Sequence, residues 1–413
     1  MTNGFEQEPQ GRTNVKPKAL QRRTPSFLQW FYNLPLGYKQ LIALIVAELT
    51  SIVGLSVGAR WIITTGLRNQ LLNQAKAEIT VTESYINLKV EQTGLGFWSL
   101  SKAPAIISIA QIYANNRTLP APNQEQIKQI LQNEIKTRQI EYATLIGRDF
   151  RIIVNANRNR SGETFNPNNL IRQVFNNSKQ IQANAIVRWF ELAKESPYLP
   201  LGKAHQDALI RYTLTPVRAP GNSKVLAVLV SGDIVNGKLP LMAGILEDFR
   251  GGYSGIYARN PTGEFTLATS LDQGEAADIE QAKPNVALSD TSLLAAAAAP
   301  NGQIVTGRMV VGTQTYTMTA KAIPNLIIEE ASGPQPVFSA QPVTILVRGT
   351  PETTLNKLLR QSLRQEEIVL LLALLVTGVW TLIFRRTITK PIEQLGRNAQ
   401  EFAEGNRQVR AQG

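Results

Sequence analysis

Cysteine is absent from all 413 residues, and histidine occurs only once, at His205. The first absence excludes disulfides, thiolate metal sites, iron–sulfur clusters and cysteine nucleophiles. A Ser-His-Asp triad would have to use His205, which lies in a polar stretch. We therefore expect no catalytic residues, no metal site and no cofactor, and we expect that the chain is not an enzyme.

Charged residues are also few, at 18%, although the net charge of +12 is strongly basic. The basic residues are scattered, without a Lys/Arg block, a zinc-finger spacing or an RRM signature, so we expect no nucleic-acid partner. Attraction to anionic membrane lipid is the alternative use of this charge. The apolar fraction of 43% is that of an ordinary globular protein, so most of the chain should fold in water.

Two long apolar runs interrupt this ordinary composition. The run over 41–57 contains one charged residue, Glu48, and the run over 368–384 contains none. Each has roughly the minimum length at which a helix crosses the hydrocarbon core of a bilayer. Two buried core helices are the alternative, but the second run has no charged residue and so leaves no face for solvent. We predict membrane-spanning helices over 39–63 and 368–384.

The flanking residues favour one orientation. The first run follows a long polar leader, which is typical of an uncleaved anchor and not of a signal peptide. Lys and Arg are about equally frequent on both sides, but the pair Arg385-Arg386 directly after the second run favours a cytoplasmic C-terminus. We therefore expect a two-pass protein of the inner (plasma) membrane, with both termini cytoplasmic and residues 64–367 outside.

The first run also carries a pattern that favours association of helices. Gly54 and Gly58 form a G-x-x-x-G motif, which lets two helix backbones approach closely. Glu48 lies beside this face, and a carboxylate inside a membrane usually faces protein. We predict a homodimer contact through Glu48, Gly54 and Gly58; for Glu48, a position near one membrane interface is an equal alternative.

A short amphipathic helix is predicted directly after the second run. Its apolar or small residues recur at steps of four and three, as in a coiled-coil seam. Pro391 lies near its start and Gly405 at its end, which are typical helix boundaries. The seam residues are Ile388, Ile392, Leu395, Ala399 and Phe402.

This segment resembles the first helix of a HAMP domain. The resemblance rests on Pro391-Ile392, Leu395, Ala399, Ala403 and Gly405-Asn406. It implies a parallel dimeric four-helix bundle that passes conformational signals from the membrane to an output domain. A HAMP domain has a second helix, whereas this sequence ends at Gly413, so we expect 385–413 to be a partial HAMP domain whose downstream signalling domain or protein lies outside this sequence.

The central 300 residues are predicted to form an α+β structure. Apolar residues at helical spacing predict one long helix after the membrane, ended by Gly94 and Gly96, and a second helix over Asn123–Arg138. Two pairs of strands then surround turns, the first over 142–154 and the second over 255–268. Further strands are predicted over 208–216, 225–230, 303–311, 315–322 and 343–347, with a short helix over 290–299 and a helix over 351–367. The pattern indicates two successive helix-plus-sheet units.

This arrangement resembles a double Cache domain, in which two PAS-like modules stand on a long helix. The run Val225–Ile234 ends in Gly-Asp-Ile, as the closing strand of the membrane-distal module commonly does. Residues 31–37 and the first apolar run are similar to cyanobacterial methyl-accepting chemotaxis receptors of the phototaxis type. The resemblance implies a cytoplasmic tail over 1–38 and an extracytoplasmic sensor over 64–367, with a distal module over about 95–240 and a proximal module over about 250–350.

The same resemblance implies a ligand site. Amino-acid-binding members have an Arg-x-Trp-Tyr motif, a Tyr-x-Asp motif and the Asp of Gly-Asp-Ile. Arg188, Trp189, Phe190, Asp207 and Asp233 are the corresponding residues here. The Arg would pair with a carboxylate, the Asp with an ammonium, and the aromatic residues would form the walls. The sequence departs from the motif, because Arg188 directly precedes Trp189 and a His replaces the Tyr; aromatic residues in the core and charges on the surface are the alternative.

These features predict a transmembrane signal-transducing receptor of the chemotaxis or phototaxis type, with an unidentified small-molecule ligand. The alternative is the input half of a sensor histidine kinase or nucleotide cyclase, which uses the same kind of extracytoplasmic part. Glu-rich methylation helices downstream would indicate a chemoreceptor, and a His-box with an ATP lid would indicate a kinase. A surface hydrolase on a membrane stalk is a third hypothesis, but no nucleophile–base pair supports it.

Overall fold

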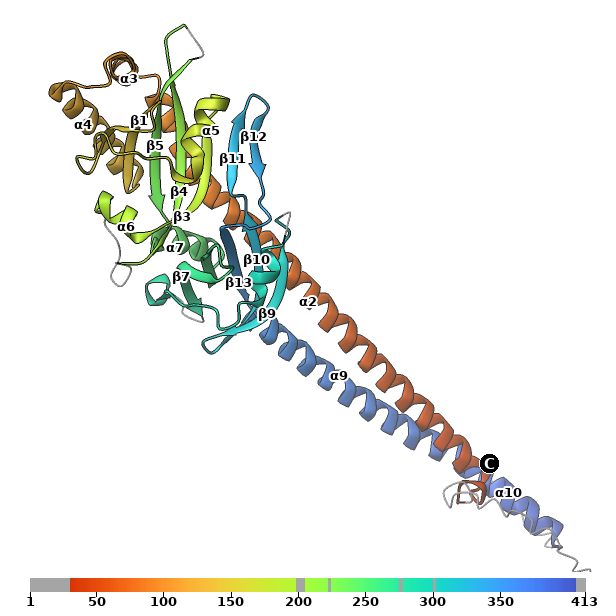
Figure 1. Ribbon diagram of the computed structural model, residues 1–413. Coiled ribbons are helices and arrows are strands. Elements are labelled where there is room, and N and C mark those ends of the chain that lie inside the picture. Colours follow the sequence, from red (N-terminus) through yellow and green to blue (C-terminus); the bar gives the residue numbers. More distant parts are fainter. Residues whose placement is uncertain (1–29, 198–204, 222–223, 275–277, 300–301, 406–413) are drawn as a thin grey trace, which may run out of the picture. The chain divides into compact units, whose positions relative to one another are not determined.

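The computed structural model describes residues 30–197, 205–221, 224–274, 278–299 and 302–405 (Figure 1). The chain divides into two compact units, one over 63–360 and the other formed by 1–62 with 361–413. The first unit contains both sheets, and the second contains the two apolar runs. The two units are described separately below.

Two helices carry the apolar runs. Helix α2 covers Leu36–Leu100, and helix α9 covers Thr353–Phe384. Each contains an 18-residue window that is long and apolar enough to cross a membrane, with mean hydropathies of 2.1 and 2.4, and neither window is buried among the described residues. Near the ends of these windows, Arg60 Nε donates to Glu366 Oε2 at 3.1 Å. By length and composition, the structure therefore has the two candidate spans that the sequence predicts.

The predicted dimer residues of the first run have open surroundings in a single chain. A Cβ atom added at Gly54 or at Gly58 would meet no other atom within 4 Å. Glu48 is half-buried. This leaves room for a second helix at the G-x-x-x-G face, and the dimer contact stays a prediction.

Helix α2 does not end at Gly94 and Gly96, so that prediction is wrong. Both glycines lie inside the helix, at places where other segments approach it closely. A Cβ at Gly96 would lie 1.8 Å from the guanidinium carbon of Arg138, and one at Gly94 would lie 3.1 Å from Gln180 Oε1. Glycine inside a helix costs only about 1 kcal/mol relative to alanine, and the close packing here offsets that cost.

The distal module contains a seven-stranded antiparallel sheet. Its strand order is β12-β11-β3-β4-β5-β1-β2. The strands are β1 Tyr142–Gly147, β2 Ile152–Asn155, β3 Ile181–Val187, β4 Ala208–Arg218, β5 Val225–Ile234, β11 Leu326–Glu330 and β12 Gly333–Val337. The last two follow the other strands by about 90 residues in sequence, as discussed below.

The proximal module contains a six-stranded antiparallel sheet of order β8-β7-β6-β13-β10-β9. The strands are β6 Gly252–Arg259, β7 Phe265–Gly274, β8 Lys283–Pro284, β9 Val305–Val311, β10 Gln314–Ile323 and β13 Thr344–Pro351. If β11 and β12 are left out of the distal sheet and β8 out of the proximal sheet, the remaining five strands of each, numbered in chain order, have the order 2-1-5-4-3. The predicted repeat of two helix-plus-sheet units is therefore present as a repeat of topology.

Helices cover both faces of the distal sheet. Tyr142 and Ile146 of β1 belong to one apolar cluster, and the alternate residues Ala143 and Leu145 belong to the other. Strands β4 and β5 are consequently buried along almost their whole length. Besides parts of α2 and α9, the unit over 63–360 contains the α-helices α3 Pro104–Asn116, α4 Ala121–Arg138, α5 Leu170–Asn177, α6 Trp189–Leu192, α7 Leu239–Asp248 and α8 Ser292–Ala297.

The hairpin β11–β12 links the two modules. It follows β10 of the proximal sheet in sequence, but β11 pairs with β3 of the distal sheet, with Leu326 opposite Ala183 (Figure 1). The sequence did not predict this hairpin, because Pro334 and Pro336 argue against a strand. Strand β12 is an edge strand, where proline is tolerated since no further strand needs its N–H group.

The segment after α9 is helical, as predicted. A π-helical turn, Arg385–Thr389, leads into α10, Lys390–Ala403, and Pro391 lies in its first turn. Gly405 follows with a φ of +102°, a conformation that favours glycine at the end of a helix. The seam residues Ile388, Ile392, Leu395, Ala399 and Phe402 are exposed in the single chain. The HAMP bundle itself stays a prediction.

Candidate functional site

The predicted ligand residues lie in two separate places. Arg188, Trp189 and Phe190 follow β3 at the start of α6, where the backbone N–H of Trp189 donates to Asp207 Oδ1 at 2.9 Å. The Trp189 ring lies 4.9 Å from the His205 ring and packs against the distal core. Arg188 is exposed, and Phe190 is 64% exposed. Trp189 is thus partly buried against the core, whereas the neighbouring Arg188 and Asp207 are on the surface.

Asp233 lies elsewhere on the sheet. The register places it on β5 opposite Arg211 of β4, and Arg211 lies opposite Asn184 of β3. Arg188 is four residues further along the chain than Asn184, which corresponds to about 13 Å along a strand. The structure therefore does not bring Arg188 next to Asp233.

Asp233 belongs instead to a group of five charged residues, which we call the junction cluster. Its members are Lys89 of α2, Glu141 before β1, Arg211, Asp233 and Lys238 before α7. Asp233 pairs with Arg211 and Lys238, and the Lys89 ammonium lies 3.8 Å from it. Lys238 also pairs with Glu141 at 2.9 Å. The cluster joins the long helix, the distal sheet and the segment that leads into the proximal module.

The electrostatics of the junction cluster are dominated by burial and by its three cations. Burial alone would raise the pKa of Asp233, but Arg211, Lys238 and Lys89 together lower it to about 2. Burial lowers the pKa of Lys89 and raises that of Glu141. Asp233 therefore stays ionised with its cationic partners at hand. Three cations and two carboxylates leave one net positive charge.

An open cleft lies against the junction cluster. It has a volume of about 450 Å³, and its walls include Lys89, Glu141, Lys238 and Ser196. Charged groups with perturbed pKa values in a cleft are physical indicators of a functional site. The two ammonium groups give this cleft the chemistry to bind a small anion such as a carboxylate.

A second ionic group anchors the segment that follows β3. The buried guanidinium of Arg160 pairs with Glu195, and it also contacts Glu191 at 2.6 Å and Glu163 at 2.9 Å. Asn155 donates to Glu195 at 2.9 Å. These bonds hold residues 189–195, and with them Trp189, against the distal core.

A third ionic group, which we call the helix clamp, joins α2 to the proximal sheet. Arg348 of β13 is fully buried, and its Nε donates to Glu78 Oε2 of α2 at 2.9 Å. Thr350 Oγ1 donates to the same oxygen at 2.8 Å. The remaining guanidinium nitrogens donate to the carbonyls of Gly251, at 2.7 Å, and Tyr253, at 3.1 Å. The clamp consists of Glu78, Arg348 and Thr350.

Further bonds along α2 strengthen this contact. Lys321 of β10 pairs with Glu83, and Thr319 Oγ1 of the same strand donates to the carbonyl of Ala75 at 3.3 Å. Strand β13 ends at Pro351, and α9 begins at Thr353. The strand that holds α2 is therefore the strand that leads directly into α9.

No protein-family model matches the chain, and no curated protein matches it. Solved structures with partial similarity to the chain include the following three domains. The sensor domain of the Vibrio cholerae histidine kinase DctB is 15% identical, with a TM-score of 0.36, covering 68% of this chain and 98% of that one. The ligand-binding domain of the Campylobacter jejuni chemoreceptor Tlp3, in complex with 4-methylisoleucine, is 12% identical, with a TM-score of 0.35, covering 70% of this chain and 94% of that one.

The periplasmic domain of Vibrio cholerae LuxQ is 11% identical, with a TM-score of 0.36, covering 67% of this chain and 99% of that one. Similarity at this level carries no assignment of function, so the function must be inferred from the residues of this chain.

Sequence analysis missed the residues that make the strongest contacts, namely Arg211, Glu78 and Arg348. For the two arginines the signal was a charge inside an apolar stretch, as in Ala208-Leu209-Ile210-Arg211 and Ile345-Leu346-Val347-Arg348, whereas Glu78 has no such signal. A charge at such a place is buried with a partner, but the sequence does not tell which partner. Among the described residues, no group of three His, Cys, Asp or Glu side chains is placed to hold a metal ion.

Proposed function

We propose that this protein is a two-pass membrane receptor of the chemotaxis or phototaxis type. In this proposal, residues 64–367 form an extracytoplasmic double Cache sensor, and 385–413 begin a HAMP relay in the cytoplasm. The support comes from two candidate spans, two modules of equal topology between them and a helix after the second span. The protein is not an enzyme in this proposal.

The helix clamp is the observation that carries this proposal. A receptor must transmit a change in its sensor to the helices that cross the membrane. Here the buried pair Arg348–Glu78 ties α2 to β13, and β13 continues into α9. A movement of the proximal sheet would therefore also move α2 and α9, the two helices that contain the apolar runs. Packed interfaces of this kind change by small discrete displacements, as transmembrane signalling requires.

The ligand in this proposal is a small anion that binds in the cleft beside the junction cluster. Lys89 and Lys238 line the cleft. The Lys89 ammonium is only weakly paired, since it lies 3.8 Å from Asp233, and it is available to a ligand carboxylate. The cluster also contacts α2, so ligand binding there acts on the same helix as the clamp.

A thermal-shift screen of small carboxylates, including amino acids, on the full chain in nanodiscs tests this assignment. We expect at least one ligand to raise the unfolding temperature of the wild type and of Arg188→Met, but not that of Lys89→Met. A ligand effect that disappears in Arg188→Met and persists in Lys89→Met would instead locate the site beside Trp189 and Asp207. The absence of any shift across the panel would contradict the cleft.

We also propose that the receptor is a homodimer. Beyond the apolar run, α2 exposes Val81, Tyr85, Leu88 and Leu95, each between 38% and 71%, at spacings that fit a heptad seam. Because the chain has no cysteine, Leu88→Cys gives one unique thiol. We expect oxidation to give a disulfide-linked dimer with Leu88→Cys but not with Lys76→Cys, which lies on another face of α2. Equal cross-linking at both positions would contradict the seam.

The input half of a sensor histidine kinase or nucleotide cyclase is the second candidate function. The helix clamp and the two modules fit this second function equally well, because the two kinds of receptor differ in their output domain. The presence of methylation helices or of a kinase core after residue 413 in the full-length gene product decides between the two.

A further inference from the structure

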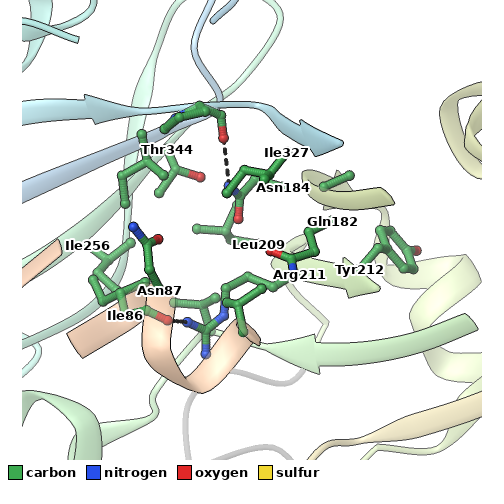
Figure 2. Close-up of a pocket in the computed structure, with 15 residues that line it drawn as sticks. Ile86, Asn87, Gln182, Asn184, Leu209, Arg211, Tyr212, Ile256, Ile327 and Thr344 are labelled. Carbon is green, nitrogen blue, oxygen red and sulfur yellow. Dashed lines mark hydrogen bonds between the residues drawn. The ribbon is translucent and has the colours of Figure 1, made fainter. Parts of the chain in front are cut away.

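A small cavity lies where the two modules meet (Figure 2). It has a volume of about 20 Å³. Its walls come from α2, from β3 and β4 of the distal sheet, and from β6 and β13 of the proximal sheet. A cavity needs roughly 10–15 Å³ to hold one water molecule, so this one has room for a water-sized species but not for an organic ligand.

Two buried polar atoms in the cavity wall have no hydrogen-bond partner among the described residues. They are Nε of Arg211, a residue that is 6% exposed, and Oγ1 of Thr344, a residue that is 3% exposed. Figure 2 shows both side chains at the cavity, with the amide of Asn87 pointing into the same space from α2. Buried polar groups are nearly always paired, so two such atoms around one cavity indicate a bound species.

The chemistry of these atoms selects the kind of species. Arg211 Nε can only donate, and the Thr344 hydroxyl and the Asn87 amide can donate as well. Arg211 is also a member of the junction cluster, which carries one net positive charge. A negative species would satisfy the donors and balance this charge, whereas a water molecule would do only the first.

We propose that this cavity is a binding site for a small monatomic anion, with chloride as the candidate, held by Arg211 Nε, Thr344 Oγ1 and the Asn87 amide. The anion would bridge α2, the distal sheet and the proximal sheet, and would thereby stabilise the junction of the two modules. The site does not depend on the receptor function proposed above, because it rests on the cavity, its unpaired donors and the charge of the junction cluster.

Thermal unfolding of the full chain in nanodiscs tests the proposal at constant ionic strength. Sodium chloride and sodium bromide are compared with sodium gluconate, whose anion is too large for the cavity. A ligand that binds only the folded state raises the unfolding temperature with its concentration. We expect a saturable rise of about 2–4 °C in either halide, well above the dissociation constant. Equal unfolding temperatures in gluconate and halide would overturn the proposal and leave water as the occupant.

Matched variants locate the effect. Thr344→Val removes the unpaired hydroxyl at nearly constant shape, and we expect it to abolish the halide shift, whereas Thr344→Ser keeps it. Thr269→Val is the control, because Thr269 also has a buried hydroxyl without a partner among the described residues but does not line the cavity. If halide raised the unfolding temperature of Thr344→Val as much as that of Thr269→Val, the anion would bind elsewhere. Asn87→Ala provides a second, independent loss of a donor if Thr344→Val does not fold.

Discussion

The distal and proximal sheets share the order of five strands but differ in how their buried charges are placed. In the distal module, Asp233 and its cations lie beside an open cleft, and Lys89 and Lys238 stay partly accessible. In the proximal module, the pair Arg348–Glu78 is buried, at 0% and 4% side-chain exposure, and lines neither this cleft nor the cavity between the modules. One topology can therefore serve two purposes. Charges beside an open cleft are suited to ligand binding, whereas a fully buried ion pair is suited to holding a helix against a sheet.

The largest effect on stability is expected for the buried pair Arg348–Glu78. Arg348→Met should destabilise the sensor by about 3–5 kcal/mol, because it leaves the Glu78 carboxylate buried without its partner. The double variant Glu78→Met/Arg348→Met should lose less stability than Arg348→Met alone, since no unpaired charge remains buried. Urea unfolding of the full chain in detergent measures both.

Lys179→Met is the control for this comparison. Lys179 also pairs with a glutamate, Glu330, at 2.6 Å, but both side chains are 40% exposed. Exposed pairs contribute about 1 kcal/mol at most, so this variant should differ little from the wild type. A loss of stability from Lys179→Met as large as that from Arg348→Met would contradict the distinction between buried and exposed ion pairs.

A smaller effect, which depends on pH, is expected from Asp233 in the junction cluster. The pKa of Asp233 is about 2 in the folded protein and has its ordinary value of 3.8 when the chain is unfolded. A lowered pKa stabilises the folded state above the unfolded pKa, and this contribution is lost as the pH falls from about 4 to about 2. The contribution should be about 2 kcal/mol.

Asp233→Asn removes this titration. We expect the wild type to lose stability more steeply than Asp233→Asn between about pH 4 and pH 2, and the two curves to run parallel above pH 5. Unfolding by urea at a series of pH values gives both curves. If the stability of the two proteins changed equally with pH in this range, the cations would not lower the pKa of Asp233.

The smallest effect concerns two glycines of α2. Gly66 has no atom within 4 Å of an added Cβ, whereas Gly96 faces the guanidinium of Arg138 at 1.8 Å. Gly66→Ala should stabilise the helix by about 0.5–1 kcal/mol, because alanine is the better helix former. Gly96→Ala should gain nothing, since it displaces Arg138 from its bond to the carbonyl of Gln92, 3.1 Å away. Equal gains from both variants would show that α2 does not pack closely on α4 at this point.

Much of the fold was predictable because local patterns determine it. The predicted helix over Asn123–Arg138 corresponds to α4, and the strand pair over 142–154 corresponds to β1 and β2. Apolar periodicity and turn residues signal such elements within a few residues of sequence. The topology repeat follows from the same local signals occurring twice.

The contacts that matter most for the proposed function were not predictable, because they join residues far apart in the chain. Glu78 and Arg348 are separated by 270 residues, and Arg211 and Asp233 meet only through the register of β4 and β5. The resemblance to amino-acid receptors pointed to Arg188, but it is Arg211 that pairs with Asp233. A sequence pattern identifies a charge that needs a partner, whereas only the packed fold supplies that partner.

The central claim is that both modules lie on the opposite side of a membrane from α10. Labelling of single-cysteine variants in intact cells tests it directly, since the natural chain has no cysteine background. Thr313 lies in the exposed turn between β9 and β10, and Gln394 is exposed on α10. We expect a membrane-impermeant maleimide to modify Thr313→Cys in intact cells, and to modify Gln394→Cys only after the membrane is permeabilised. Equal labelling of the two positions before permeabilisation, or protection of Thr313→Cys, would contradict the receptor.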